Sequence, residues 1–586
     1  MRFPTLTTPQ VSRDMIDVFK GYNHNLRIGS GEFYDMTNLC SADYPVLSPR
    51  PQRGVFAESI YTTDNTALTP TGMIGKDELC WVDGPDFVIG EYRISMGLDP
   101  DTRKDLVSMG AYVIIMPDKK YINTADLTDY GSIEATVTTA STVTYDLCKI
   151  DGVEYQGALK QDTAPTDPKN MDLWIDTSST PHVLKQYSSV NAMWVSIATT
   201  YIKISATGIG LPFSDGDGVT ISGVESTALA DLNSTMVIWA RGDDYIVVKG
   251  ILDQSTTQET AITIKRQMPN MDFIIESENR LWGCRYGTAL NGEVVNEIYA
   301  SKLGDFKNWN VFAGISTDSY AATVGTDGQF TGAITHLGHP LFFKETCMHK
   351  VYGSYPSNFQ IQTTACRGVQ KGCANSLAIV NEVLYYKARS GVCAYDGSLP
   401  TEMSAALGDM AYGNAVAGVL GNKYYISMQD ANEVYHLFVY DTLKGMWHRE
   451  DNTHVWQFCT CRGELYFTEQ DSAKIMTVTG SGTPDKKPVS WMAETGVIGT
   501  DSPDKKYISR LDVRMSLTLG ATVMFFIQYD SLGEWAPLYT MTGTTLKSFY
   551  VPIRPKRCDH LRLRMVGQGM AKIYSICKSV EQGSNV

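Results

Sequence analysis

The chain has 586 residues, 43 % of them hydrophobic and 19 % charged, and its formal net charge is −14. This length exceeds what one hydrophobic core supports, so we expect two to four folded domains. The acidic balance disfavours a protein that grips nucleic-acid phosphates. Because no apolar run approaches the length of a bilayer span, we expect no membrane insertion.

The N-terminal segment carries prolines and arginines but no catalytic signature. In residues 33–54, FYDMTNLCSADYPVLSPRPQRG, the prolines at 45, 49 and 51 cannot donate to a sheet ladder, which favours an edge or an extended path. Arg50 and Arg53 end the run, and an arginine at such a rim typically binds a carboxylate or backbone carbonyls. We predict that residues 1–54 form an extended arm with the first strands. The arm reaches either its own C-terminal module or a neighbouring subunit.

Short aromatic strands, each followed by a turn and another strand, recur through 55–141 and again through 267–489. The equivalent strand positions Leu341, Leu384, Tyr424 and Leu465 are separated by 43, 40 and 41 residues. A period in the forties with several strands per unit is typical of propeller blades. We predict a degenerate propeller of six or seven blades, with the first blades in 55–141 and the others in 267–489.

Residues 142–266 have a different, Thr/Ser-rich texture with short β patterns, and they predict one or two small β modules inserted in a propeller loop. Trp174 and Trp194 in this insertion are the best binding candidates in the chain, as a platform on which a sugar stacks. Packing within the small module is the favoured interpretation of the pair. Asp215 and Asp217 fall short of a calcium ligand set and indicate a tight turn before a strand.

The period fails from about residue 490, where cleanly alternating strands predict a two-sheet β-sandwich over 490–586. Helical periodicity is weak throughout, so the expected fold class is all-β. The basic run 553–564, IRPKRCDHLRLR, places several charges on alternating strand positions and indicates a solvated face of this sandwich.

The search for chemistry yields no predicted catalytic, cofactor-binding or metal-binding residue. The turns at 440–447 and 529–535 approach an Asp-box, but their spacing indicates ordinary hairpins, and TGIGLPF at 207–213 lacks the third glycine of a dinucleotide fingerprint. His336 and His339 bracket a glycine turn without a metal-ligand cadence. Arg241-Gly242-Asp243 spells an adhesion tripeptide but reads as a hairpin turn.

The twelve cysteines occur without a CxxC pair, so neither a zinc ribbon nor a thioredoxin-type site is indicated. Cys459 and Cys461 are two residues apart, which on a strand places both side chains on one face. The first ten residues, MRFPTLTTPQ, lack the apolar stretch of a secretory signal. We therefore expect reduced, mostly buried thiols.

Several turn and strand-end motifs resemble propeller-type tail proteins of double-stranded-DNA bacteriophages, the nozzle, hub or DNA-stabilisation proteins of short-tailed phages. The likeness covers most of the chain outside 142–266. Its motifs are MTNL…YPVLSPRP in the arm, SKLGD…NW (Ser301, Lys302, Gly304, Asp305, Trp309) and GVCAYDG (Gly391, Val392, Ala394, Tyr395, Asp396, Gly397).

The resemblance implies a structural virion protein rather than an enzyme. It would form a ring from copies of itself in the tail, contact other tail or connector proteins, and help retain or deliver genomic DNA that passes without specific binding. Such a protein is assembled in the host cytoplasm and resides in the virion tail, without cofactors. The alternative is a tail propeller that binds a host-surface receptor or glycan through 142–266.

Overall fold

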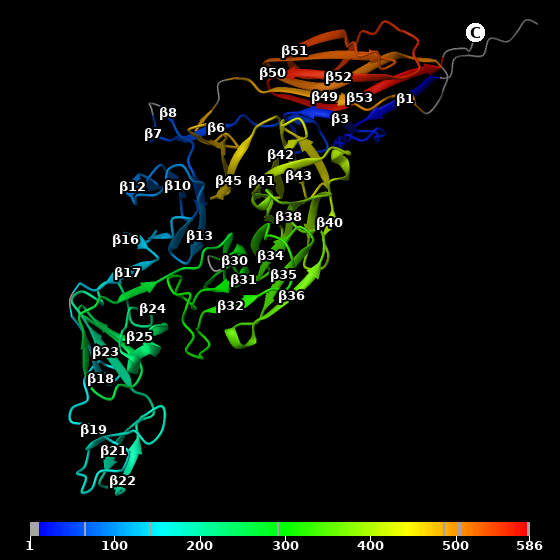
Figure 1. Ribbon diagram of the computed structural model, residues 1–586. Coiled ribbons are helices and arrows are strands. Elements are labelled where there is room, and N and C mark those ends of the chain that lie inside the picture. The colour runs from blue at the N-terminus through cyan, green and yellow to red at the C-terminus, as the bar shows by residue number, and fades with distance from the viewer. Residues whose placement is uncertain are drawn as a thin grey trace, which may run out of the picture.

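The computed structural model describes residues 11–63, 66–140, 142–289, 292–484, 487–500 and 505–582, and these are almost entirely β-strand. Their helical segments are 3-10 turns: η1 (Thr227–Leu232), η2 (Pro356–Asn358), η3 (Ala374–Ser376) and η4 (Ala405–Leu407). Across the described ranges, no helix is long and apolar enough to cross a membrane. Figure 1 shows a propeller body between an inserted module at one end and a layered C-terminal module at the other. The predicted all-β fold, with a propeller, an inserted β module and a C-terminal sandwich, is confirmed.

Seven antiparallel blades build the propeller in the part of the chain that the structure describes. Blade 1 consists of β9 (Gly72–Gly75), β10 (Leu79–Asp83), β11 (Asp86–Ile89) and β12 (Tyr92–Ser95). Blade 2 consists of β13 (Asp105–Met109), β14 (Tyr112–Met116), β15 (Lys120–Asn123) and β16 (Asp126–Ser132). Blade 3 consists of β29 (Phe273–Ser277), β30 (Arg280–Thr288), β31 (Val294–Ala300) and β32 (Tyr320–Thr323). Blade 4 consists of β33 (Gly332–His336), β34 (His339–Lys344), β35 (Cys347–Tyr352) and β36 (Gln360–Ala365). Blade 5 consists of β37 (Ala378–Val380), β38 (Val383–Ala388), β39 (Gly391–Tyr395) and β40 (Thr401–Glu402). Blade 6 consists of β41 (Tyr412–Leu420), β42 (Lys423–Asp430), β43 (Tyr435–Asp441) and β44 (Met446–Arg449). Blade 7 consists of β45 (Val455–Cys461), β46 (Glu464–Glu469), β47 (Lys474–Thr477) and β6 (Gly54–Glu58).

The first strands of most successive blades contact one another around the axis, η3 contacts β33 at the junction of blades 4 and 5, and β45 of blade 7 lies against β9 of blade 1, so the ring is closed. The four residues that define the sequence period, Leu341, Leu384, Tyr424 and Leu465, lie on the second strands β34, β38, β42 and β46. Each of them is fully buried. The period therefore arises because each of these blades buries an apolar side chain at the same place.

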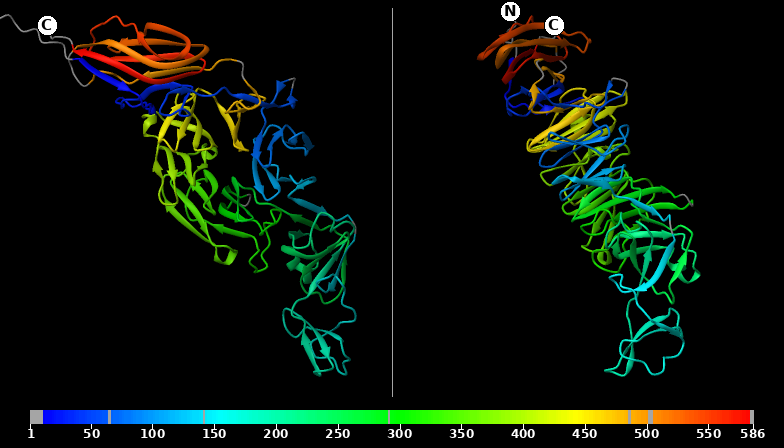
Figure 2. Two further views of the ribbon diagram at one scale, coloured as in Figure 1. Left: turned by 180° about the vertical axis from the view of Figure 1, so that it is seen from behind. Right: turned by 90° about the vertical axis from the view of Figure 1, so that its left-hand side faces the viewer.

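The inserted module leaves and re-enters the propeller through two paired strands, β17 (Ala135–Thr138) and β28 (Thr263–Arg266). It therefore begins before the predicted boundary at 142. Between these strands lie β18 (Val143–Cys148), β19 (Leu159–Gln161), β20 (Leu173–Asp176), β21 (Val183–Ser188), β22 (Met193–Ser196), β23 (Tyr201–Ser205), β24 (Gly218–Ser222), β25 (Thr235–Gly242), β26 (Tyr245–Lys249) and β27 (Thr256–Gln258). Strands β19 to β22 form a separate small sheet at the far tip (Figure 2).

The C-terminal module is built on β50 (Lys506–Tyr529), which pairs with β53 (Ala571–Gln582) along its first half and with β52 (Leu561–Gln568) along its second. β51 (Ala536–Val551) pairs along β50, and β49 (Ser490–Thr495) pairs with β52. Burial alternates strictly along much of β50 and β52, because one face of each strand packs inside the module.

The N-terminal arm lies on its own chain. β1 (Val11–Ile16) pairs with β53, β2 (Gly21–Tyr22) with β44 of blade 6, and β3 (Glu32–Thr37) with β49. β4 (Leu39–Cys40) and β5 (Ser48–Pro49) form a small hairpin, as do β7 (Thr62–Thr63) and β8 (Thr66–Ala67). β6 then pairs with β47, and β48 (Thr483–Pro484) pairs with β6 as well. The strand at residue 54 thus belongs to the last blade and closes the ring.

Two arginines of the arm anchor this closure. The Arg53 guanidinium lies 2.9 Å from the Glu450 carboxylate and 3.0 Å from that of Asp451. Arg50 lies 3.3 Å from Asp451 and also donates to Asn38 Oδ1 at 2.7 Å. The side chains of Arg53 and Glu450 are 9 % and 3 % exposed, and Arg50 Nε lies 3.6 Å from the Glu450 carboxylate, so removing Arg53 takes the nearer of two counter-charges from a buried carboxylate.

We predict that Arg53→Met destabilises the protein by about 2–3 kcal/mol, because Glu450 stays buried and keeps only Arg50, 3.6 Å away, as its counter-charge. The matched control is Arg367→Met. Arg367 pairs with Glu402 at 2.9 Å, but its side chain is 55 % exposed. Since an exposed pair contributes about 0–1 kcal/mol, chemical denaturation should separate the two variants clearly. Equal and small losses would show that the arm does not secure the ring.

Blade interiors also hold a buried neutral histidine. His349 on β35 is fully buried between the hydroxyls of Thr326 and Thr363, each 2.9 Å from one ring nitrogen. Burial lowers the pKa of His349 to about 4, and the charge of Lys344 lowers it further. The folded protein therefore excludes a proton that the unfolded chain accepts below about pH 6.5.

We predict that this histidine makes the fold acid-sensitive. Between about pH 6.5 and 4 the unfolded chain binds the proton and the folded chain does not. As the pH decreases through this range, this one group therefore lowers the free energy of unfolding by roughly 3 kcal/mol. His349→Asn removes that dependence. The difference in unfolding free energy between wild type and variant should shrink as pH falls through this window. A difference that is the same at pH 7 and pH 4 would contradict the assignment.

Candidate functional site

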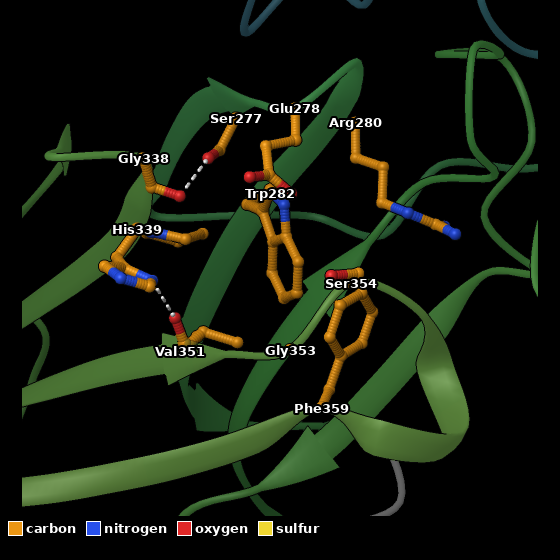
Figure 3. Close-up of a pocket in the computed structure, with 11 residues that line it drawn as sticks. Ser277, Glu278, Arg280, Trp282, Gly338, His339, Val351, Gly353, Ser354 and Phe359 are labelled. Carbon is orange, nitrogen blue, oxygen red and sulfur yellow. Dashed lines mark hydrogen bonds between the residues drawn. The ribbon is translucent and has the colours of Figure 1, made fainter.

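Two hairpin turns from neighbouring blades form the rim of a pocket. Glu278 and Asn279 connect β29 to β30 with φ of 50° and 58°, and Leu337 and Gly338 connect β33 to β34 with φ of 50° and 75°. Positive φ at both central residues is the two-residue hairpin geometry that suits the twist of paired strands. Glu278 and Gly338 of these two turns line the pocket at the boundary between blades 3 and 4 (Figure 3).

The wall of the pocket is aromatic and rigid. Trp282 on β30 and Phe359, which follows η2, meet edge to face with ring centroids 5.0 Å apart. The Arg280 guanidinium lies 5.6 Å from the Phe359 centroid and donates to the carbonyls of Ser301, Asp318 and Ser316 at 2.7, 2.6 and 2.8 Å. Those carbonyls satisfy much of its donor capacity, so Arg280 stiffens the wall.

Two polar groups of the pocket have no partner within the described ranges. The Glu278 carboxylate accepts no hydrogen bond and forms no ion pair there, and the Trp282 indole N–H donates none, although Trp282 is only 3 % exposed. His339 donates from Nδ1 to the Val351 carbonyl at 3.1 Å, which leaves Nε2 as an acceptor in the neutral ring. The pocket encloses about 160 Å³.

Sequence patterns identified only the edge of this pocket. His339 was noted as half of a histidine pair around a glycine turn, and it lines the pocket. His336 instead is buried and contacts the Glu382 carbonyl at 2.6 Å. Glu278, Trp282 and Phe359 were missed, because about sixty residues separate the two hairpins and a single sequence carries no signal that pairs them.

The tryptophans of the insertion do not form a flat platform. Trp174 and Trp194 contact edge to face, with planes 68° apart and centroids separated by 5.4 Å. Trp174 is 5 % exposed, its indole N–H donates to the Gln161 carbonyl at 3.0 Å, and the Lys185 ammonium covers its ring. The favoured interpretation of internal packing agrees with this geometry.

The remaining motif residues act within turns. Asp217 is buried and ion-paired with Arg266 at 2.5 Å, and it accepts a hydrogen bond from Asn308 at 2.8 Å, which docks the insertion on blade 3. Arg241 and Asp243 lie at the exposed hairpin between β25 and β26. The described residues contain no group of three or more histidines, cysteines or carboxylates that could hold a metal ion.

The motifs behind the tail-protein resemblance also lie at blade edges. Ser301 accepts a hydrogen bond from the Leu281 N–H, Trp309 is buried with its indole bonded to the Phe306 carbonyl, and Asp396 caps the turn at Ser398. These contacts shape blades 3 and 5. Such turn chemistry supports a fold and carries no information on function.

No protein-family model and no curated protein matches the chain. Similar solved structures include an exo-β-1,3-galactanase from Phanerochaete chrysosporium with galactose, at 8 % identity over 52 % of this chain and 94 % of that chain, with a TM-score of 0.21. AztD from Citrobacter koseri is similar at 10 % identity over 70 % and 95 %, with a TM-score of 0.26. Trypanosoma rangeli sialidase is similar at 7 % identity over 89 % and 96 %, with a TM-score of 0.18. At these values the likeness assigns no residue, substrate or reaction to this chain.

The comparisons nevertheless correct the function expected from the sequence. The named structures include a galactanase, further glycoside hydrolases and a sialidase, and none of those named is a phage tail protein. This finding contradicts the prediction of a DNA-conducting tail ring and its alternative, a tail propeller that binds a host-surface receptor or glycan. It also contradicts the prediction that the chain is not an enzyme. The tail-protein resemblance, the ring partners and the virion location stay predictions.

Proposed function

We propose that the protein binds a carbohydrate and that the pocket between blades 3 and 4 receives one sugar unit. The observation that carries this proposal is the pairing of an unpartnered acceptor with an unpartnered donor, Glu278 and the Trp282 indole, beside aromatic edges. A sugar ring presents hydroxyls that donate and accept at neighbouring positions and C–H groups that pack on aromatic rings.

The size of the pocket sets the size of the ligand. The pocket has an accessible volume of about 160 Å³, compared with about 30 Å³ per molecule in liquid water, so it admits a small ligand and not an extended one. That room suits a single sugar unit whose neighbours in a chain remain in solvent. The wall is preformed, because Arg280 and the edge-to-face pair of Trp282 and Phe359 are fixed by contacts within the blades.

The charge of the pocket selects among sugars. Glu278 contributes the exposed, unpartnered charge, while Arg280 is buried and bonded to three carbonyls. A carboxylate on the ligand would meet like charge at Glu278, which disfavours uronic and sialic acids. We therefore expect neutral hexoses to bind in preference to acidic sugars.

A second candidate function is sugar hydrolysis at the same pocket. The observation that favours it is a carboxylate, Glu278, in one pocket with the imidazole of His339, since both residue types serve as general acid or base. The common glycosidase mechanism requires two carboxylates about the scissile bond, and Glu278 is the one carboxylate lining this pocket in the described residues. Binding is therefore the primary proposal.

We predict that methyl β-galactoside or methyl β-glucoside shifts the Trp282 indole signal in a proton–nitrogen correlation spectrum. The chain has ten tryptophans, and Trp282→Phe identifies the signal. Because a hydrogen bond to a charged group is worth about 1.5–3 kcal/mol, Glu278→Gln should weaken binding by about tenfold or more. Trp174→Phe is the control, since that indole is already bonded within its module. A signal that no neutral sugar moves, or equal binding of glucuronate, would refute the proposal.

We predict for the second candidate that any turnover of chromogenic hexosides is lost in Glu278→Gln and Glu278→Ala alike, while the fold is retained. The reason is that either change removes the acid–base carboxylate. Turnover that survives both substitutions would move the reaction away from this pocket. Sugar binding without turnover in wild type would leave the primary proposal standing and dismiss hydrolysis.

A further inference from the structure

The inner strands β9, β13, β29, β33, β41 and β45, together with η3, line a second cavity on the propeller axis, with a volume of about 430 Å³. Its polar lining comes from Arg103 and Asp105 before and on β13, Asn375 in η3 and Gln457 on β45. Phe273 and Phe458 contribute apolar surface. The cavity and the sugar pocket lie at opposite ends of β29, with Phe273 at one end and Ser277 at the other.

The cavity contains two opposite charges that are not paired with each other. The Asp105 carboxylate forms no hydrogen bond or ion pair within the described ranges, and Arg103 Nε is buried without a hydrogen-bond partner. The Arg103 guanidinium instead lies over the Trp456 ring, 5.0 Å from its centroid. Lys104 does not neutralise Asp105, because it is fully buried and paired with Asp118 at 2.5 Å.

The surrounding blades disfavour both charges. Burial raises the pKa of Asp105, although Arg103 opposes the shift, and burial lowers the pKa of Arg103. Solvent nevertheless reaches Asp105, whose residue is exposed toward the cavity. An arrangement of this kind is stabilised by a ligand that supplies the missing counter-charges.

An amide of the same cavity adds a directional acceptor. Gln457 donates from Nε2 to the Met73 carbonyl at 3.2 Å, which fixes the amide, and its Oε1 is buried without a partner. An ammonium group offers three N–H donors and satisfies both a carboxylate and an amide oxygen. A carboxylate suits the planar fork of a guanidinium.

We propose that the axial cavity binds an α-amino acid with an apolar side chain. The ligand's carboxylate contacts Arg103, its ammonium contacts Asp105 and Gln457 Oε1, and its side chain packs on the apolar lining. A neutral ligand leaves both protein charges uncompensated, and a singly charged one compensates half of them. The accessible volume of about 430 Å³ leaves room for a side chain beyond the amino-acid backbone.

The test compares leucine with its two half-ligands on the full chain by calorimetry. Isopentylamine retains the ammonium and 4-methylpentanoate retains the carboxylate. We expect leucine to bind at least tenfold more tightly than either analogue to the wild-type protein, a result that requires no variant to fold. Equal affinity of leucine and one analogue, or no binding of leucine at millimolar concentration, overturns the proposal.

Two charge variants then locate the binding. Asp105→Asn should lose the preference for leucine over 4-methylpentanoate, and Arg103→Gln should lose the preference over isopentylamine. Glu278→Gln is the control and should bind leucine as wild type does, so that failure of the sugar proposal and failure of this one remain distinct. Leucine binding that neither axial variant changes places the site elsewhere and overturns the assignment.

Discussion

The structure depends on the closure of the propeller by a strand from the opposite end of the chain. β6 completes blade 7 beside β47, and without it the blade would present an unpaired edge to solvent. The closure also buries charge, since Arg53 reaches Glu450 and Asp451 in the connection between blades 6 and 7. Because a buried charge is tolerated only with its partner, the arm and the last two blades must assemble together.

The two cavities depend on ring closure to different degrees. The axial cavity takes part of its lining from Met73 in blade 1 and from Gln457 and Phe458 in blade 7, the blades that meet at the closure. Its shape therefore requires the ring to be shut. The sugar pocket lies between blades 3 and 4, far along the chain from that junction, and is fixed by contacts within those blades. Loss of the arm should thus disturb the axial site before the pocket at the blade boundary.

The propeller could be predicted from the sequence because successive blades repeat one burial pattern. Leu341, Leu384 and Tyr424 recur at intervals in the forties because each second strand fills the same core position. The sequence predicts six or seven blades and no definite number, since the outer strand of the last blade comes from residues 54–58 and breaks the repeat. A strand that is remote in the chain leaves no periodic signal.

The candidate sites could not be predicted from sequence patterns, for a different reason. Glu278 and Trp282 become a site only when the hairpin at 337–338 folds across them, and Arg103 and Asp105 become notable only because nothing neutralises them. Turn motifs such as SKLGD and GVCAYDG resemble a tail protein, yet Ser301 and Asp396 bond within their own blades and Lys302 bonds to the inserted module. These turn contacts stabilise the fold, whereas carboxylates without a partner, such as those of Glu278 and Asp105, indicate a candidate site.

The most direct test of this account is a structure determined with a bound methyl hexoside. The account predicts the sugar between blades 3 and 4, with one hydroxyl within hydrogen-bond distance of the Glu278 carboxylate and another oxygen accepting from the Trp282 indole. A sugar seated on Trp174 and Trp194, or in the axial cavity beside Asp105, would contradict it.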